Sequence, residues 1–347
     1  MTTTDALVEA ETHRRADGVE LWFLRIHRTT GLPPVAFGIA VAIAVTVFVA
    51  SGALHPDIPS SEAKSFAASG AFFGVSLGVI AGIMPRLIDA ARADLVRLAP
   101  LYPDEDASLA IISRALSRLT PGSTSGLTAI GAAAGFIHAW LLGQLALPWW
   151  PAIVQTLGTL ALWIAMTLSM TPLIINARLF DRLGRHADPD LFDRRATAPF
   201  GNLALRPTLV LVGLQCAYPI LVVGGGNSLA GATLIGIAVS FMTMSGLFFM
   251  PLTGIRARLR EVRRARLAEV DARISELSGK LRNFGPAVPL DRLTDLEALL
   301  GLRERILRAS TWPLDVDGIR GVLVYVVLPP LTWAAAAFVE MAIDRSL

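Results

Sequence analysis

Ionisable side chains that could bind a coupling ion or relay a proton are scarce in the apolar part of this 347-residue sequence. An ion-coupled transporter needs a carboxylate or similar group near the middle of the membrane, because the ion must bind a charged ligand. The first six apolar segments have no such group in their central turns, where His138 is the single titratable candidate. The polar residues Gln144, Gln155 and Gln215 accompany it. This pattern disfavours proton- or sodium-coupled transport and leaves passive conduction open.

Two of the polar candidates have a simple structural interpretation. A lone histidine in a membrane helix, such as His138, is more often hydrogen-bonded to a neighbouring helix than part of a proton relay. Glu340 lies near the end of the last apolar segment, so we expect its carboxylate to extend to water.

Sequence signatures of metal-dependent catalysis and of phosphate binding are absent. The sequence has no His-Glu-x-x-His and no phosphate-binding loop. The histidines lack the spacing of metal ligands, and the single cysteine, Cys216, excludes an intrachain disulfide and a cysteine-based zinc site. We therefore expect a protein that is not an enzyme and that binds no cofactor or metal.

Glycines recur every four residues in the second apolar segment, at Gly70, Gly74, Gly78 and Gly82. This spacing keeps them near one face of a helix, where another backbone can approach closely. The third apolar segment repeats the device once, at Gly131 and Gly135. A subunit interface or a pore lining would use such a face. Close packing inside one subunit would use it equally, and we favour this second interpretation.

The composition identifies a membrane protein. Hydrophobic residues make up 53% of the chain, charged residues 17%, and the mean hydropathy is +0.56. A soluble domain has about 25% charged residues, so this chain has too little polar surface to coat a water-soluble globule. The apolar residues also occur in segments of about 20, the length that crosses a bilayer. We expect the lipid bilayer as a partner and no nucleic acid, because the basic residues flank apolar segments and alternate with acids.

The apolar segments predict about seven transmembrane helices, arranged as three in–out–in hairpins and a final helix that Pro329 and Pro330 interrupt. That last segment either spans the membrane or re-enters on one side. The expected crossings are 33–53, 66–86, 126–146, 151–173, 207–224, 229–251 and 320–342.

Arginine and lysine set the expected orientation. Basic residues gather in alternate connections, which places the N-terminus in the cytoplasm by the positive-inside rule. Of the 31 basic residues only Lys64 and Lys280 are lysines, a bias typical of a GC-rich bacterial genome. We therefore expect a protein of the bacterial cytoplasmic (inner) membrane.

Two soluble elements are expected outside the membrane. Residues 1–30 form an N-terminal cytoplasmic segment, in which apolar residues from Val19 to Ile26 predict a short amphipathic helix on the membrane surface. Residues 254–312 carry apolar residues at helical spacing on both sides of Asn283–Pro286, which predicts a cytoplasmic antiparallel helical hairpin packed like a coiled coil. The six-helix membrane region is then 31–253, and the C-terminal membrane segment is 313–347.

Three of the expected crossings have a similar sequence at their inner ends. Met and Pro recur at Met84-Pro85, Met170–Pro172 and Met250-Pro251, and an arginine-bearing amphipathic stretch follows each. Either the three hairpins are true repeats, or proline and arginine simply accumulate at such helix ends.

Two functions from different classes fit these features. We expect an oligomeric channel or passive facilitator of unassigned substrate, in which glycine-rich helices of several copies pack around a path. The alternative is a membrane-anchored signalling or scaffolding protein, in which the hairpin at 254–312 binds a cytoplasmic partner or a copy of itself.

Overall fold

The computed structural model describes residues 10, 12–102, 106–221, 231–282 and 290–313. The described residues are mostly helical (86%), as the composition and periodicity predict. The elements, in chain order, are β1 (Val19–Glu20), α2 (Trp22–Thr30), α3 (Pro34–Ala50), η1 (Ser51–Leu54), α4 (Ser60–Leu98), η2 (Ala99–Leu101), α5 (Asp106–Ala115), β2 (Arg118–Leu119), α6 (Pro121–Leu141), η3 (Gln144–Ala146), α7 (Trp149–His186), α8 (Arg194–Gln215), α10 (Gly231–Arg282) and α11 (Leu290–Arg308).

Within this part of the chain, four helical stretches are long and apolar enough to cross a membrane. They are Pro34–Leu54, Ser60–Leu101, Trp149–His186 and Arg194–Leu221. Helix α6, where we expected a crossing over 126–146, is not among them. It begins earlier, at Pro121, with a polar Gly-Ser-Thr-Ser-Gly turn, and it ends at Leu141 because Gly143 adopts a left-handed conformation. The expected crossing at 320–342 and Glu340 lie outside the described residues.

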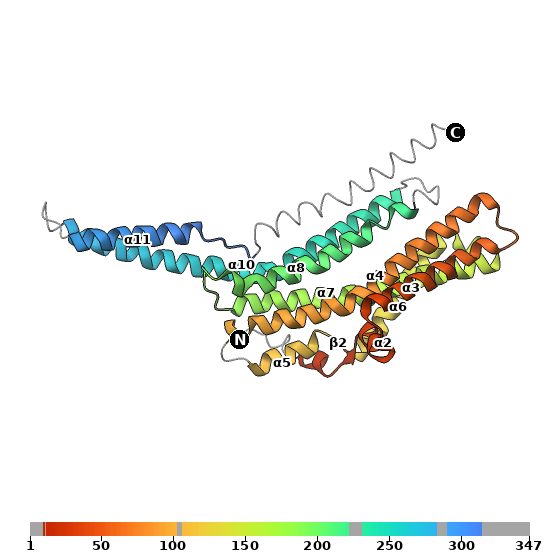
Figure 1. Cartoon of the computed structure of the whole chain (residues 1–347), viewed down its shortest axis with the longest axis horizontal. Coiled ribbons are helices and arrows are strands. Elements are labelled where there is room, and N and C mark those ends of the chain that lie inside the picture. The colour runs from red at the N-terminus through yellow and green to blue at the C-terminus, as the bar shows by residue number, and fades with distance from the viewer. Residues whose placement is uncertain (1–9, 11, 103–105, 222–230, 283–289, 314–347) are drawn as a thin grey trace, which may run out of the picture.

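The long helices pack in sequence-adjacent pairs: α3 with α4, α6 with α7, and α8 with α10 (Figure 1). Helices α7 and α8 also contact each other, and each of them contacts both α4 and α10. The outer face of α3 is apolar and exposed at four-residue steps. These positions, Val35, Ile39, Ile43 and Val47, suit contact with lipid.

The three helices with a proline near the expected inner end run on past it. Pro85 lies inside α4, Pro172 inside α7 and Pro251 inside α10. Helix α4 alone has 39 residues, or about 58 Å, against about 30 Å of hydrocarbon. The helices continue because the residues after each proline still have one apolar face, and these faces pack together.

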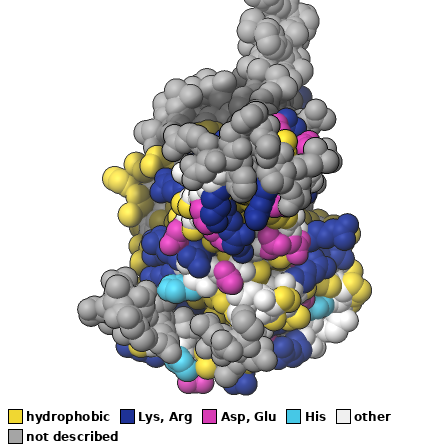
Figure 2. Space-filling model, turned by 90° about the vertical axis from the view of Figure 1, so that its left-hand side faces the viewer, with side chains coloured by type: hydrophobic (Ala, Val, Ile, Leu, Met, Phe, Trp, Pro, Cys, Tyr) yellow, Lys and Arg dark blue, Asp and Glu magenta, His cyan; other side chains and the backbone are white. Residues whose placement is uncertain are grey.

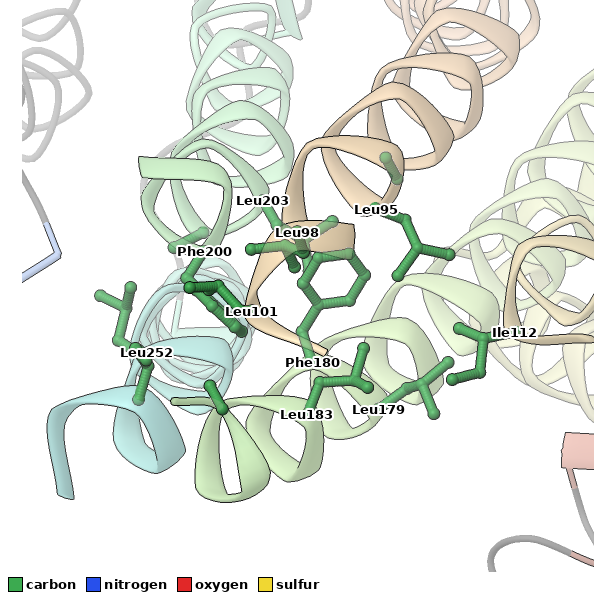
Figure 3. Close-up of a cluster of buried hydrophobic side chains, with 14 of the residues drawn as sticks. Leu95, Leu98, Leu101, Ile112, Leu179, Phe180, Leu183, Phe200, Leu203 and Leu252 are labelled. Carbon is green, nitrogen blue, oxygen red and sulfur yellow. The ribbon is translucent and has the colours of Figure 1, made fainter. Parts of the chain in front are cut away.

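That packing forms a hydrophobic cluster at one end of the bundle, which we call the basal cluster (Figure 3). Figure 3 shows leucine and phenylalanine side chains of several helices directed towards a common centre. Phe180 of α7 and Phe200 of α8 are fully buried, with ring centroids 6.0 Å apart in an edge-to-face arrangement. Helix α4 contributes Leu95 and Leu98, and α10 contributes residues from Leu252 to Leu259.

The N-terminal segment packs on the bundle. Strands β1 and β2 pair antiparallel, with Val19 opposite Leu119, and α2 follows immediately. Phe23 and Leu24 of α2 are buried in a protein core that they share with residues of α4 and α7, whereas Ile26, on the face expected at a membrane surface, is 36% exposed.

Candidate functional site

The glycine face of α4 is filled by α3 of the same chain. A Cβ atom at Gly78 would lie 2.6 Å from the carbonyl oxygen of Gly38, and one at Gly70 would lie 2.7 Å from that of Thr46. Gly74 and Gly82 likewise face α3 backbone or side-chain atoms. The two helices therefore approach at a distance that no other side chain allows. This arrangement agrees with the second interpretation of the glycines, close packing inside one subunit. Because α3 covers the glycine face of α4, that face is not available to line a pore or to form a subunit interface.

The second glycine pair has the same role between α6 and α7. A Cβ atom at Gly131 would lie 2.8 Å from the Cα of Ile164, and one at Gly135 would lie 2.9 Å from the Cα of Leu160. Both candidate glycine series thus hold the two helices of a hairpin together.

The polar candidates of the sequence are placed separately. The indole Nε1 of Trp163 donates a hydrogen bond of 3.1 Å to Nδ1 of His138, which joins α7 to α6. The side-chain oxygen of Gln144 accepts a hydrogen bond of 3.1 Å from Thr159, and both residues are buried. Gln215 is half-buried near the end of α8. The structure does not bring these residues into one site.

A charged network that the sequence analysis missed lies beside the basal cluster. The carboxylate of Asp94 on α4 is 1% exposed and 2.6 Å from a guanidinium nitrogen of Arg206 on α8. It also accepts a hydrogen bond of 3.4 Å from Asn202 and lies 3.4 Å from Arg97. A buried carboxylate is stable in such a place only when it is paired and hydrogen-bonded. The available signal was its position: Asp94 stands on the apolar face of α4, between the buried Ala91 and Leu98.

A second polar network fastens the N-terminal segment. The buried guanidinium of Arg15 donates to the carbonyl of Arg118 at 3.2 Å and to the side-chain oxygen of Asn176 on α7 at 3.2 Å. The amide of Asn176 donates in turn to the carbonyl of Leu116 at 3.1 Å. A cavity of about 20 Å³ separates the two networks, because both Asn176 and Arg206 line it. It has room for about one water molecule.

Helices α7 and α10 cross at another pair of glycines, next to the basal cluster. A Cβ atom at Gly184 would lie 2.5 Å from the backbone nitrogen of Ile255, and one at Gly254 would collide with the carbonyl oxygen of Asp181. Arg258 also donates to the carbonyl of Ala187 at 3.0 Å. These contacts fix the position of α10 at the point where it leaves the bundle.

The hairpin of α10 and α11 begins at this crossing. Helix α10 continues to Arg282, and α11 packs back along it through Val270 and Ile306, which are buried against each other's helices. Arg303 of α11 pairs with Asp271 of α10 at 2.7 Å, and Arg263 donates to the carbonyl of Leu307. At its base the Arg256 guanidinium lies 3.8 Å from the ring centroid of Trp312, a cation–π contact.

The surface of this end of the molecule is highly charged. Figure 2 shows Lys and Arg side chains gathered there with acidic side chains between them. Many form ion pairs within the hairpin, such as Lys280 with Glu276 at 2.6 Å. The hydrogen bond and the charge of Lys280 lower the pKa of Glu276. A hairpin with exposed charges of both signs is the most distinct surface element of the described residues.

No protein-family model, curated protein or solved structure matches this chain. The described residues also contain no group of three or more His, Cys, Asp or Glu side chains that could hold a metal ion.

Proposed function

We propose that this chain is a non-enzymatic protein of the bacterial inner membrane that presents the α10–α11 hairpin in the cytoplasm as the docking element of a signalling or scaffolding assembly. The observation that carries the proposal is the continuity of α10. One helix of 52 residues includes an apolar half, the crossing with α7 and the long arm of the hairpin. The hairpin is thereby held rigidly by the bundle instead of hanging on a flexible linker.

The arginine distribution supports a cytoplasmic hairpin. The basal ends of α4, α7, α8 and α10 are rich in arginine, whereas the connection from η3 to the start of α7 has no basic residue. The positive-inside rule then places the hairpin and the N-terminus in the cytoplasm. In this arrangement α6, the apolar half of α10 and the segment 320–342 complete seven crossings.

The glycines no longer favour a channel. Gly70, Gly74, Gly78 and Gly82 were the principal support for helices of several copies around a path, and all four pack against α3 of the same chain. The docking proposal needs no such path. It requires only a stable membrane base and an exposed hairpin. Four helical stretches long and apolar enough to cross a membrane, and a hairpin with many exposed residues, support it.

Site-specific photo-crosslinking in intact membranes tests the proposal. A photoreactive amino acid at Ala298, an exposed position of α11, should capture the same discrete partner or partners in repeated experiments. The same group at Arg195, an exposed position at the start of α8, serves as the matched control. Replacement of residues 264–305 by a short Gly/Ser turn removes Ala298, so the photoreactive amino acid is then placed in the part of the hairpin that remains. This variant should still insert into the membrane but should give no cross-linked product with the partner.

The proposal fails if hairpin and control positions give the same products, or if shortening the hairpin changes none of them. Conduction of ions or osmolytes by the purified protein in liposomes, with the hairpin shortened, would favour the channel instead.

A further inference from the structure

Helix α11 has a second apolar edge that no described residue covers. Leu293, Leu300 and Leu307 are 45%, 49% and 41% exposed. The helix uses a different face, which includes the buried Ile306, to pack on α10. Single exposed leucines are common on protein surfaces. Three at a seven-residue spacing lie along one side of the helix and can supply the a positions of a coiled-coil seam. The corresponding d positions, Leu296 and Arg303, are half-buried, and Arg303 pairs with Asp271 of α10.

The direction of α11 restricts how a second copy can meet this line. Helix α10 extends from the bundle along the long axis of the molecule, and α11 lies against it in the opposite direction (Figure 1). Two copies in one membrane are related by a two-fold axis along the membrane normal. With the long helices of the bundle across the membrane, as proposed above, such an axis runs roughly along α11, so two α11 helices would meet in parallel and in register.

The charges beside the leucines suit this parallel arrangement. With the leucines at the a positions, Arg292 takes the preceding g position and Glu297 the following e position. In a parallel coiled coil a g residue faces the e residue five places later in the other helix. Arg292 of each copy then faces Glu297 of the other, on both sides of the seam. The next g position holds Leu299, so it places no like charge opposite Glu304.

We infer that two copies of this chain associate in the membrane through a parallel, in-register pairing of α11, with Leu293, Leu300 and Leu307 along the seam. This inference rests on the proposed function, and it identifies a partner of the hairpin as the hairpin of a second copy. The seam is narrow, since only one position in seven is apolar and free. Its strength therefore depends on the high effective concentration of two chains in one membrane.

Disulfide cross-linking of the full-length protein in liposomes tests both the pairing and its direction. In a Cys216→Ala background, Leu293→Cys, Leu300→Cys and Leu307→Cys should each form cross-linked dimers under mild oxidation. Ala298→Cys, which is exposed on another side of α11, should form few. A mixture of differently tagged Leu293→Cys and Leu307→Cys proteins should give dimers of like chains and almost no mixed dimer.

A loss-of-contact variant completes the test. Leu300→Lys places two charges on the seam and should weaken the dimer about tenfold or more, as followed by single-molecule photobleaching in liposomes. Three results would each overturn the inference. They are cross-linking at Ala298 as efficient as at the seam, abundant mixed dimers between positions 293 and 307, and an unchanged dimer fraction in Leu300→Lys. If the hairpin is photo-crosslinked to another protein but the seam cysteines form no dimers, the proposed function is supported and the inferred pairing of two copies is wrong.

Discussion

The carboxylate of Asp94 on α4 and the guanidinium of Arg206 on α8 meet at 2.6 Å beside an otherwise apolar cluster. The Asp94 side chain is 1% exposed, whereas that of Arg206 is 37% exposed. The pair thus joins two long helices with one charge inside the protein and the other at its edge.

Replacing Asp94 with Ala should destabilise the protein. Removing one member of a fully buried pair costs about 3–5 kcal/mol, and because Arg206 can reach water we expect about 1–3 kcal/mol here. Thermal unfolding in detergent measures the change. Arg97→Gln, which removes an exposed partner of the same carboxylate at 3.4 Å, should cost less than about 1 kcal/mol. Equal losses in the two variants would show that the Asp94–Arg206 contact has no special weight.

Gly78→Ala should loosen the α3–α4 hairpin. The added methyl group would lie 2.6 Å from the Gly38 carbonyl oxygen, so the helices must separate at a cost of about 1–3 kcal/mol. The matched control is Gly213→Ala on α8, where nothing lies within 4 Å of the added carbon. The first variant should unfold at lower temperature, and the second should not. If Gly78→Ala instead changes the oligomeric mass and leaves stability intact, the glycine face serves a subunit interface.

Gly254→Ala should disturb the crossing of α7 and α10, because its methyl group would collide with the carbonyl of Asp181. Gly279→Ala lies on the same helix in open space. It should stabilise the helix by about 0.5–1 kcal/mol, since alanine loses less backbone entropy than glycine. Opposite shifts of the unfolding temperature are therefore expected. Shifts of the same sign would contradict the close crossing.

Arg15 should protect the N-terminal segment from solvent exchange. Its side chain bonds to Arg118 and Asn176, whereas the side chain of its neighbour Arg14 is exposed. Arg15→Gln should raise amide hydrogen exchange at residues 16–20 and 117–119, because the β1–β2 pairing loses its support. Arg14→Gln should leave exchange there unchanged. Unaltered exchange in both proteins would mean that the β1–β2 pairing does not depend on Arg15.

His138→Leu should have a small effect. It removes the hydrogen bond from Trp163, a contact of a kind that contributes about 0.6 kcal/mol in membrane proteins. The unfolding temperature in detergent should fall by no more than a few degrees, with Trp163→Phe giving a similar decrease. A much larger effect of His138→Leu than of Trp163→Phe would assign the histidine a further role.

The sequence was a good guide where a pattern depends on local spacing. Apolar length, the four-residue glycine step and the break near Asn283 predicted long helices, close helix pairs and a hairpin, because each property belongs to a single helix. The number of crossings cannot be obtained from local spacing alone, because α6 has a polar first turn and Pro85 does not end α4.

The sequence was a poor guide where two distant segments meet. Asp94 and Arg206 are 112 positions apart, and Arg15 and Asn176 are 161 apart. Each of these residues looks like an ordinary polar residue until the partner is known. The α7–α10 crossing was missed for the same reason, because Gly184 and Gly254 are isolated glycines in their own helices.

Because α10 is one continuous helix, a small movement at its base produces a larger movement at its far end. From Ile255, which is fully buried in the basal cluster, to Arg282 the helix extends about 40 Å, so a tilt of only about 5° at its base moves the far end by about 3.5 Å. Helix α11 travels with it, because Arg303 and Ile306 fasten the two arms together. A displacement near the membrane too small to break the packing of the bundle is thereby enlarged at the tip of the hairpin.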